Sequence, residues 1–160
     1  MPFFEEMVIQ ESIEIKTTPE KIFKFLTGIV DNERYKIWHN TSHVNFRWIK
    51  GEPWEEDSVM YAEEYLHGKL HKLTFKVIKI VKNQYIEYTP TSLLVRIYFP
   101  KNGFRIEPKG DYSLFTASGA IRVGWITKFF FKKAMEKGLS SVRIHLKEEG
   151  ENLKRILELK

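Results

Sequence analysis

The sequence of 160 residues contains no cysteine. This absence excludes disulfide bonds and thiolate nucleophiles, and it removes thiolates from the possible metal ligands. Histidine, aspartate and glutamate remain as the side chains that can hold a metal ion. Any metal site in this chain must therefore use nitrogen and oxygen ligands.

Long hydrophobic runs are also missing. No stretch approaches the roughly 20 apolar residues that a transmembrane helix needs. Residues 1–10, MPFFEEMVIQ, carry two acidic side chains and lack the basic region of a signal peptide. We therefore expect a cytoplasmic protein with no stable membrane insertion.

Neither sign of charge dominates the chain. The formal net charge is +5, but the 26 Lys and Arg residues are scattered among 21 Asp and Glu residues. We therefore expect no nucleic-acid partner, because such a partner needs clustered basic side chains. The chain also lacks a glycine-rich phosphate loop, a GxSxG motif and a clear catalytic triad.

Hydrophobic residues make up 42% of the sequence and aromatic residues 14%. These proportions are typical of a folded globular protein that is rich in aromatic side chains. The length fits one domain over residues 1–160. Such a domain can bury a substantial core and, inside a curved sheet, a cavity as well.

The local patterns begin with a strand and two short helices. Residues 11–26, ESIEIKTTPEKIFKFL, alternate at first and then start a helix with Thr18 as N-cap and Pro19 at the first helical position. Residues 30–39, VDNERYKIWH, predict a second short helix. The first strand is therefore followed by two short helices.

The middle of the chain reads as strands. Residues 43–124 have a period of mostly two and are divided by turn signals, which predicts an antiparallel meander of about six strands. Residues 93–110, LLVRIYFPKNGFRIEPKG, belong to this run. From Trp125 a long helix is expected to reach the C-terminus, and Gly138 is the position where this helix is expected to be weakened.

Residues 11–28, the meander and residues 151–158, ENLKRILE, together resemble the START-like helix-grip superfamily, also called the polyketide cyclase or SRPBCC superfamily. The likeness extends from about Ser12 to Leu157. It implies an α+β fold in which a curved antiparallel sheet of about seven strands wraps around the long C-terminal helix. It also implies an internal cavity that holds a small hydrophobic or aromatic ligand.

Four shorter segments are similar to the zinc-dependent diacetylphloroglucinol hydrolase branch of that superfamily. They are YKIWHNTSH at 35–43, EEYLHGKLH at 63–71, LVRIYFPKNGF at 94–104 and HLKEEGENL at 145–153. In that branch, two His and two Glu residues hold a metal ion that assists cleavage of a carbon–carbon bond next to a carbonyl group. The resemblance therefore implies zinc, or another divalent metal, as a cofactor.

His145 and Glu149 are the metal-ligand candidates on the predicted terminal helix. They are four residues apart, so they project from successive turns and can reach one ion. Glu149 falls near the apolar stripe of the helix, where a carboxylate is costly unless it is paired or bound to a metal. The alternatives are a Glu149 that turns to water or bonds to His145.

Glu64 is the candidate from the meander. It shares strand parity with Met60 and Ala62, whereas its neighbour Glu63 points to the other face. We therefore expect Glu64 to be the inward carboxylate. The alternative is a cross-strand partner for a lysine near Lys72.

His39 and His43 both lie at the junction between the second helix and the next strand, and either can supply the fourth ligand. We favour His39 because it follows the helix that closes one end of the cavity, and we keep His43 as the alternative. His67 and His71 lie on a hairpin next to lysines and are interpreted as surface residues.

Four tyrosines are candidates to orient a phenolic substrate or to carry a proton: Tyr35, Tyr61, Tyr98 and Tyr112. The alternative is that they are simply wall residues. Residues 129–131, FFF, are expected to pack the start of the terminal helix under the rim of the sheet. A dimer or membrane contact is the alternative for that segment.

The sequence thus favours a metal site of His39, Glu64, His145 and Glu149. The function that follows from the resemblance is metal-dependent hydrolysis of a small aromatic or polyketide-like ketone. The alternative is non-catalytic binding or transport of a hydrophobic small molecule or lipid. We expect a monomer or a homodimer.

Overall fold

The computed structural model describes residues 4–66 and 68–159. Within these ranges the chain forms seven strands and five helices. The strands are β1 (Phe4–Ile15), β2 (His43–Lys50), β3 (Val59–Leu66), β4 (Lys69–Val81), β5 (Tyr85–Pro90), β6 (Lys101–Pro108) and β7 (Ser113–Gly124). The helices are α1 (Pro19–Thr27), α2 (Asn32–Trp38), α3 (Leu93–Tyr98), α4 (Trp125–Phe130) and α5 (Lys132–Glu158).

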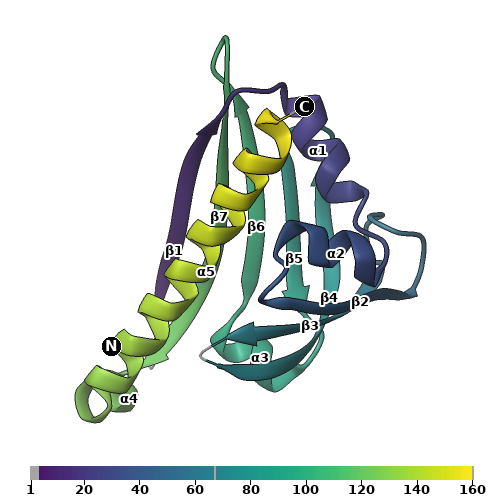
Figure 1. Ribbon diagram of the computed structural model, residues 1–160. Coiled ribbons are helices and arrows are strands. Elements are labelled where there is room, and N and C mark those ends of the chain that lie inside the picture. Colours follow the sequence, from purple (N-terminus) through teal and green to yellow (C-terminus); the bar gives the residue numbers. More distant parts are fainter. Residues whose placement is uncertain (1–3, 67, 160) are drawn as a thin grey trace.

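All seven strands form one antiparallel sheet in the order β1-β7-β6-β5-β4-β3-β2. The sheet curves around α5 (Figure 1). In the sequence, α1 and α2 connect the two edge strands, β1 and β2. The predicted helix-grip fold is therefore confirmed, including the two short helices after the first strand. None of the described helices is both long and apolar enough to cross a membrane.

Capping residues fix the two short helices where the sequence predicted them. The Thr18 side chain accepts a hydrogen bond from the Lys21 backbone N–H, and Pro19 occupies the first helical position of α1. Asp31 caps α2 by accepting from the Arg34 N–H at 2.9 Å. Because its start is fixed in this way, α2 turns Tyr35 and Trp38 into the interior.

The hydrophobic core fills the concave side of the sheet. It combines side chains of the strands, such as Ile86 and Phe115, with Leu153 and Leu157 from α5. Helix α5 comes close to β1 at Gly150, where an added Cβ would lie 3.2 Å from Ile13 Cγ2. The absence of a side chain there allows the last turns of α5 to pack directly on the sheet.

Two glycines of α5 give a stability prediction. Gly138→Ala is expected to raise the free energy of unfolding by about 0.5–1 kcal/mol, because alanine favours helix and its Cβ would meet nothing within 4 Å. Gly150→Ala is expected to gain less, since the same propensity is offset by the close contact with Ile13. Urea unfolding measures both, and equal gains would contradict the close packing at Gly150.

The meander departs from the prediction at residues 93–98. These residues were expected to be strand, but they form α3. Strand β5 ends at Pro90, and the Ser92 side chain accepts a hydrogen bond from the Val95 N–H at 3.3 Å. A capped helix start followed by Pro100 outweighs the strand preference of the apolar residues between them.

The terminal helix also differs from the prediction. The helix continues through Gly138, which lies within α5. It is interrupted instead at Phe131, between α4 and α5. Residues 129–131 are not packed under the sheet rim, because their three Phe side chains are 77%, 66% and 60% exposed. In Figure 1, α4 lies at the end of the sheet, where the strands of the described residues stop.

Candidate metal centre

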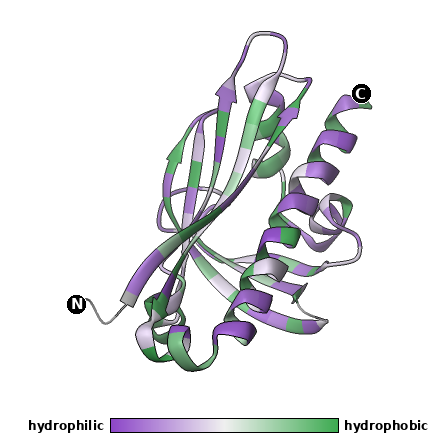
Figure 2. Cartoon of the chain, turned by 90° about the vertical axis from the view of Figure 1, so that its left-hand side faces the viewer, coloured by the Kyte–Doolittle hydropathy of each residue, from purple (hydrophilic) through white to green (hydrophobic). Residues whose placement is uncertain are grey.

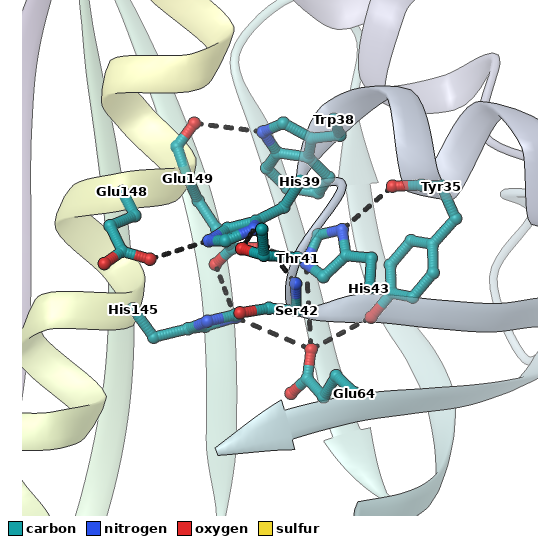
Figure 3. Close-up of polar contacts among 10 residues, drawn as sticks. All are labelled: Tyr35, Trp38, His39, Thr41, Ser42, His43, Glu64, His145, Glu148 and Glu149. Carbon is teal, nitrogen blue, oxygen red and sulfur yellow. Dashed lines mark hydrogen bonds and ion pairs between the residues drawn. The ribbon is translucent and has the colours of Figure 1, made fainter. Parts of the chain in front are cut away.

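Four side chains from three elements converge on the concave side of the sheet (Figure 3). His43 begins β2, Glu64 lies on β3, and α5 supplies His145 and Glu149. His43 Nε2 lies 3.3 Å from a Glu149 oxygen and 3.8 Å from a Glu64 oxygen. His145 Nε2 lies 3.5 Å from Glu64 and 3.6 Å from Glu149.

Backbone geometry places these groups. His43 and Glu64 are directly paired in the ladder between β2 and β3. Glu64 shares its face of β3 with the buried Met60 and Ala62, and the opposite face carries Glu63, which accepts a hydrogen bond from Tyr61 Oη at 2.7 Å. The inward residue is therefore Glu64, the one chosen from strand parity.

The hydrogen bonds of His43 fix its tautomer. Its Nδ1 lies 3.0 Å from the Tyr35 carbonyl oxygen, which can only accept, so Nδ1 carries the proton. Nε2 is the ring nitrogen that faces Glu149 and Glu64, and this buried atom has no hydrogen-bond partner among the described residues. A buried imidazole nitrogen that faces two carboxylates without a hydrogen bond is costly unless a cation or a proton lies between them.

The spacing of the cluster suits a small metal ion. A tetrahedral zinc ion with bonds of about 2.0–2.1 Å holds its ligand atoms about 3.4 Å apart. Glu64 Oε2 lies 3.8 Å from His43 Nε2 and 3.5 Å from His145 Nε2, close to that separation, whereas Glu149 approaches His43 through Oε2 at 3.3 Å and His145 through Oε1 at 3.6 Å. His43, Glu64 and His145 each offer a ligand atom within 4.8 Å of the others. The residues present therefore fit a divalent ion with nitrogen and oxygen ligands.

Without a metal ion, the charged groups of the cluster stabilise one another against the cost of burial. Burial alone would raise the pKa of Glu64, but contacts with His145, His43 and Tyr35 lower it to about 2. Burial likewise opposes the charged form of His145, yet Glu149 and Glu64 raise its pKa to about 9. In the metal-free protein at neutral pH, a protonated His145 therefore partly offsets the negative charge of the carboxylates.

His39, the favoured fourth ligand, is engaged elsewhere. Its Nδ1 accepts from the Ser42 backbone N–H at 3.2 Å, and its Nε2 lies 2.7 Å from a Glu148 oxygen. Both ring nitrogens are therefore occupied. The structure brings His43, the alternative, to the other three residues in its place, while the His39 ring lies beside that of His145 at 5.5 Å between centroids.

The four candidate tyrosines occupy different places. Tyr35 reaches the cluster: its hydroxyl donates to Glu64 at 2.9 Å, and its ring stacks on His43 with centroids 3.8 Å apart. Tyr61 lies on the opposite face of β3. Tyr98 lies on α3, and Tyr112 lies in the turn between β6 and β7.

Two aromatic residues near the cluster escaped the sequence interpretation. Tyr88 on β5 has a pKa raised well above its usual value by burial and by the charges of Glu149 and Glu64, so its phenol stays protonated beside them. Trp38 donates from Nε1 to the Glu149 carbonyl oxygen at 3.0 Å and ties α2 to α5. Strand parity with Ile86 was an available signal for Tyr88.

His71 was interpreted as a surface residue, and this was wrong. It is half-buried and pairs with Glu64 in the ladder between β3 and β4. Its Nε2 is buried without a hydrogen-bond partner among the residues that the structure describes. His67, the other histidine of that hairpin, lies outside the described residues.

A pocket of about 280 Å³ lies beside the N-terminal half of α5. Its wall is mostly apolar and includes Phe99, Ile121, Val123, Met135, Leu139 and Val142. Val142 and His145 are three residues apart on α5, so they are neighbours on one side of the helix. His145 does not line the pocket but follows Val142 of its wall by about one turn of α5.

The protonation of His145 gives a pH prediction. Its folded pKa of about 9 lies above the value of 6.5 for the free side chain, so the stability it contributes is full below pH 6.5. In metal-free protein we expect a loss of about 3 kcal/mol in the free energy of unfolding as the pH rises from about 6 to about 9.5. Urea titrations with chelator measure this, and His145→Gln should remove most of the slope. An equal slope in that variant would contradict the assignment.

The comparisons with known proteins identify the fold. A scan of protein families and a search of curated proteins found no match. Among solved structures, major latex-like protein 151 from Panax ginseng is similar with a TM-score of 0.70 and 11% identity, over 96% of this chain and 97% of that one. Norcoclaurine synthase from Thalictrum flavum, in complex with dopamine and hydroxybenzaldehyde, is similar with a TM-score of 0.71 and 13% identity, over 99% of this chain and 90% of that one. The KanY protein is similar with a TM-score of 0.71 and 13% identity, over 96% of this chain and 99% of that one.

These likenesses cover nearly the whole chain at low identity. They show that the protein has the helix-grip fold of latex-like proteins and norcoclaurine synthase, with its strands and terminal helix in the same arrangement. A shared fold does not determine chemistry. The function must be argued from the cluster and the pocket.

Proposed function

We propose that the protein is a metal-dependent hydrolase, with zinc as the preferred ion, that acts on a small aromatic or polyketide-like ketone. His43, Glu64, His145 and Glu149 would hold the ion. The observation that carries the proposal is the buried Nε2 of His43, which makes no hydrogen bond within the described part of the chain and lies 3.3 Å and 3.8 Å from the carboxylates of Glu149 and Glu64. Two neutral imidazoles and two carboxylates match the ligand preferences of zinc.

A bound zinc ion supplies Lewis acidity toward a carbonyl oxygen. The surrounding residues hold the ligands in place. Tyr35 donates a hydrogen bond to Glu64, and its own carbonyl oxygen orients His43. Such outer contacts fix the tautomer and the direction of a metal-binding imidazole. The ligand geometry is therefore set before any substrate arrives.

The net reaction adds one water molecule across a carbon–carbon bond. The hydroxyl group joins the acyl carbon, which leaves as a carboxylate, and the ring carbon takes a proton. We assign the supply of that proton to Tyr88, because burial and the charges of Glu149 and Glu64 raise the pKa of its phenol and keep it protonated. The apolar pocket, whose wall includes Leu139 and Val142 one to two turns before His145 on α5, would provide room for an aromatic acyl group.

The test is release of acetate from an acetylated polyhydroxybenzene. Protein stripped with chelator and then restored with zinc is expected to turn the substrate over, whereas the stripped protein is not. His43→Ala with the same zinc added controls for catalysis by the metal in solution. Zinc-loaded wild type that leaves a panel of aryl ketones intact would overturn the hydrolase.

A second candidate function is non-catalytic binding of a hydrophobic small molecule or lipid. The mostly apolar lining of the pocket favours it, because such walls recognise apolar ligands without chemistry. In that case the polar cluster would orient the ligand. A bound apolar molecule recovered by organic extraction, from protein that holds no metal, would favour this function over hydrolysis.

Either function makes the pocket necessary for ligand binding. Val142→Trp is expected to weaken binding of a naphthalene probe by about tenfold or more, because the indole would fill the space beside Leu139. Ile144→Trp is the matched control, since Ile144 is 54% exposed on α5 and does not line the pocket. Titration by fluorescence measures both variants. Equal affinities of the two variants for the probe would show that the probe binds outside the pocket.

A further inference from the structure

An exposed apolar surface lies at the end of the molecule opposite the C-terminus. We call it the basal patch, and it consists of Leu93, Leu94, Trp125, Ile126, Phe129, Phe130 and Phe131. Figure 1 places its two helices, α3 and α4, at this same end, and in Figure 2 the chain that leads into α5 is largely coloured as hydrophobic. These side chains are between 54% and 77% exposed.

The concentration of large apolar side chains here needs an explanation. Single exposed hydrophobic residues are ordinary on protein surfaces, but five large ones within residues 125–131 form a concentration that is typical of an interaction site. Four of the seven side chains are aromatic, and none of the seven belongs to either buried cluster of the core. The basal patch therefore contributes little to the described fold and is available to a partner.

The charges around the basal patch identify the kind of partner. Residues 125–138 contain four lysines, Lys128, Lys132, Lys133 and Lys137, and a single acidic residue, Glu136. All four lysines are exposed, and Lys128 pairs with Glu5 of β1, which leaves Lys132, Lys133 and Lys137 as the cations of this border. Residues 90–104 add Arg96 and Lys101 and contain no acidic residue. An apolar surface bordered by cations complements anionic headgroups above an apolar layer.

We propose that the basal patch docks on an anionic lipid bilayer. The Phe and Trp side chains would enter the boundary between headgroups and acyl chains, and the lysines would contact the headgroups. A second copy of the chain fits less well. In a twofold contact the same surface meets itself, so the lysines of both copies would approach one another with few carboxylates to offset them.

The position of the pocket connects docking on the bilayer with uptake of a ligand. Tyr98 and Phe99 at the end of α3, and Thr127 of α4, contribute to the pocket wall together with Met135 and Leu139 of α5. The helices that carry the basal patch thus also line the pocket. A docked molecule would hold the pocket next to the bilayer, from which an apolar compound can be taken up or to which it can be returned.

Co-sedimentation with lipid vesicles tests the docking. The full chain is expected to bind vesicles of phosphatidylcholine and phosphatidylserine at least about tenfold more tightly than vesicles of phosphatidylcholine alone, and to be released by salt. The double variant Phe129→Ser with Phe130→Ser is expected to lose at least about tenfold in affinity. Lys132→Glu with Lys133→Glu should lose the preference for phosphatidylserine.

The matched control is Val8→Ser with Ile49→Ser, which removes two exposed apolar side chains on the edge strands β1 and β2. It should bind vesicles as the wild type does. Zinc content should be the same in all variants, so failure of docking and failure of the metal site are separate results. Absence of binding to phosphatidylserine vesicles would overturn the proposal. So would a dimer in solution that the Phe variant converts to monomer, because a second copy would then cover the patch.

Discussion

His43→Ala is expected to lower the affinity for zinc by at least about 100-fold, because it removes one of four ligands and the one whose Nε2 is buried without a partner. The fold should survive, since His43 begins β2 and the core behind it is formed by Tyr35, Phe46 and their neighbours. Isothermal titration of chelator-treated protein measures the affinity. The melting temperature without zinc shows whether the variant is folded.

His39→Ala is the matched control. Both histidines are almost fully buried and lie four residues apart, but His39 bonds to Glu148 and to the Ser42 backbone instead of facing Glu64 and Glu149. Its removal should change zinc affinity by less than about tenfold. The opposite ranking, with His39→Ala the more damaging, would show that the ion is held on the other side of the His145 ring.

Tyr35→Phe is expected to weaken zinc binding by about tenfold and to lower hydrolysis by at least as much. The change keeps the ring that stacks on His43 and removes only the hydroxyl that donates to Glu64. Glu64 then loses a contact that fixes its position and helps to keep it ionised. Loss of such an outer contact typically costs about 10–100-fold in metal affinity or activity.

Tyr61→Phe is the matched control, because it removes the same hydroxyl group away from the cluster. Its hydroxyl donates to Glu63 on the opposite face of β3, so zinc affinity and turnover should stay at the wild-type values. If the two variants behave alike, the hydroxyl of Tyr35 does not support the cluster. Titration with zinc and the acetate assay decide between these outcomes.

The sequence predicts most of the fold because local signals agree with it. Thr18 and Asp31 cap their helices, the strands alternate, and the parity of Glu64 with Met60 and Ala62 is enough to turn that carboxylate inward. Residues 93–98 were misassigned because their apolar composition suits strand as well as helix. The decision there rests on the Ser92 cap.

The choice between His39 and His43 needed three-dimensional information. The turn after α2 is closed by a hydrogen bond from the His43 N–H to the His39 carbonyl at 2.9 Å, and its path decides which imidazole faces β3. No periodicity applies to such a turn. The exposure of residues 129–131 was missed for a similar reason, since an apolar run predicts burial unless the sheet ends before reaching it.

The most direct test of the metal centre is the zinc content of untagged wild-type protein, measured by plasma mass spectrometry beside His43→Ala. About one zinc ion per chain in the wild type, lost in the variant, is the predicted result. It would show that His43 completes a metal site with Glu64, His145 and Glu149. A wild-type protein that stays free of metal after zinc is added back would contradict the account and leave the cluster as a polar anchor for a bound ligand.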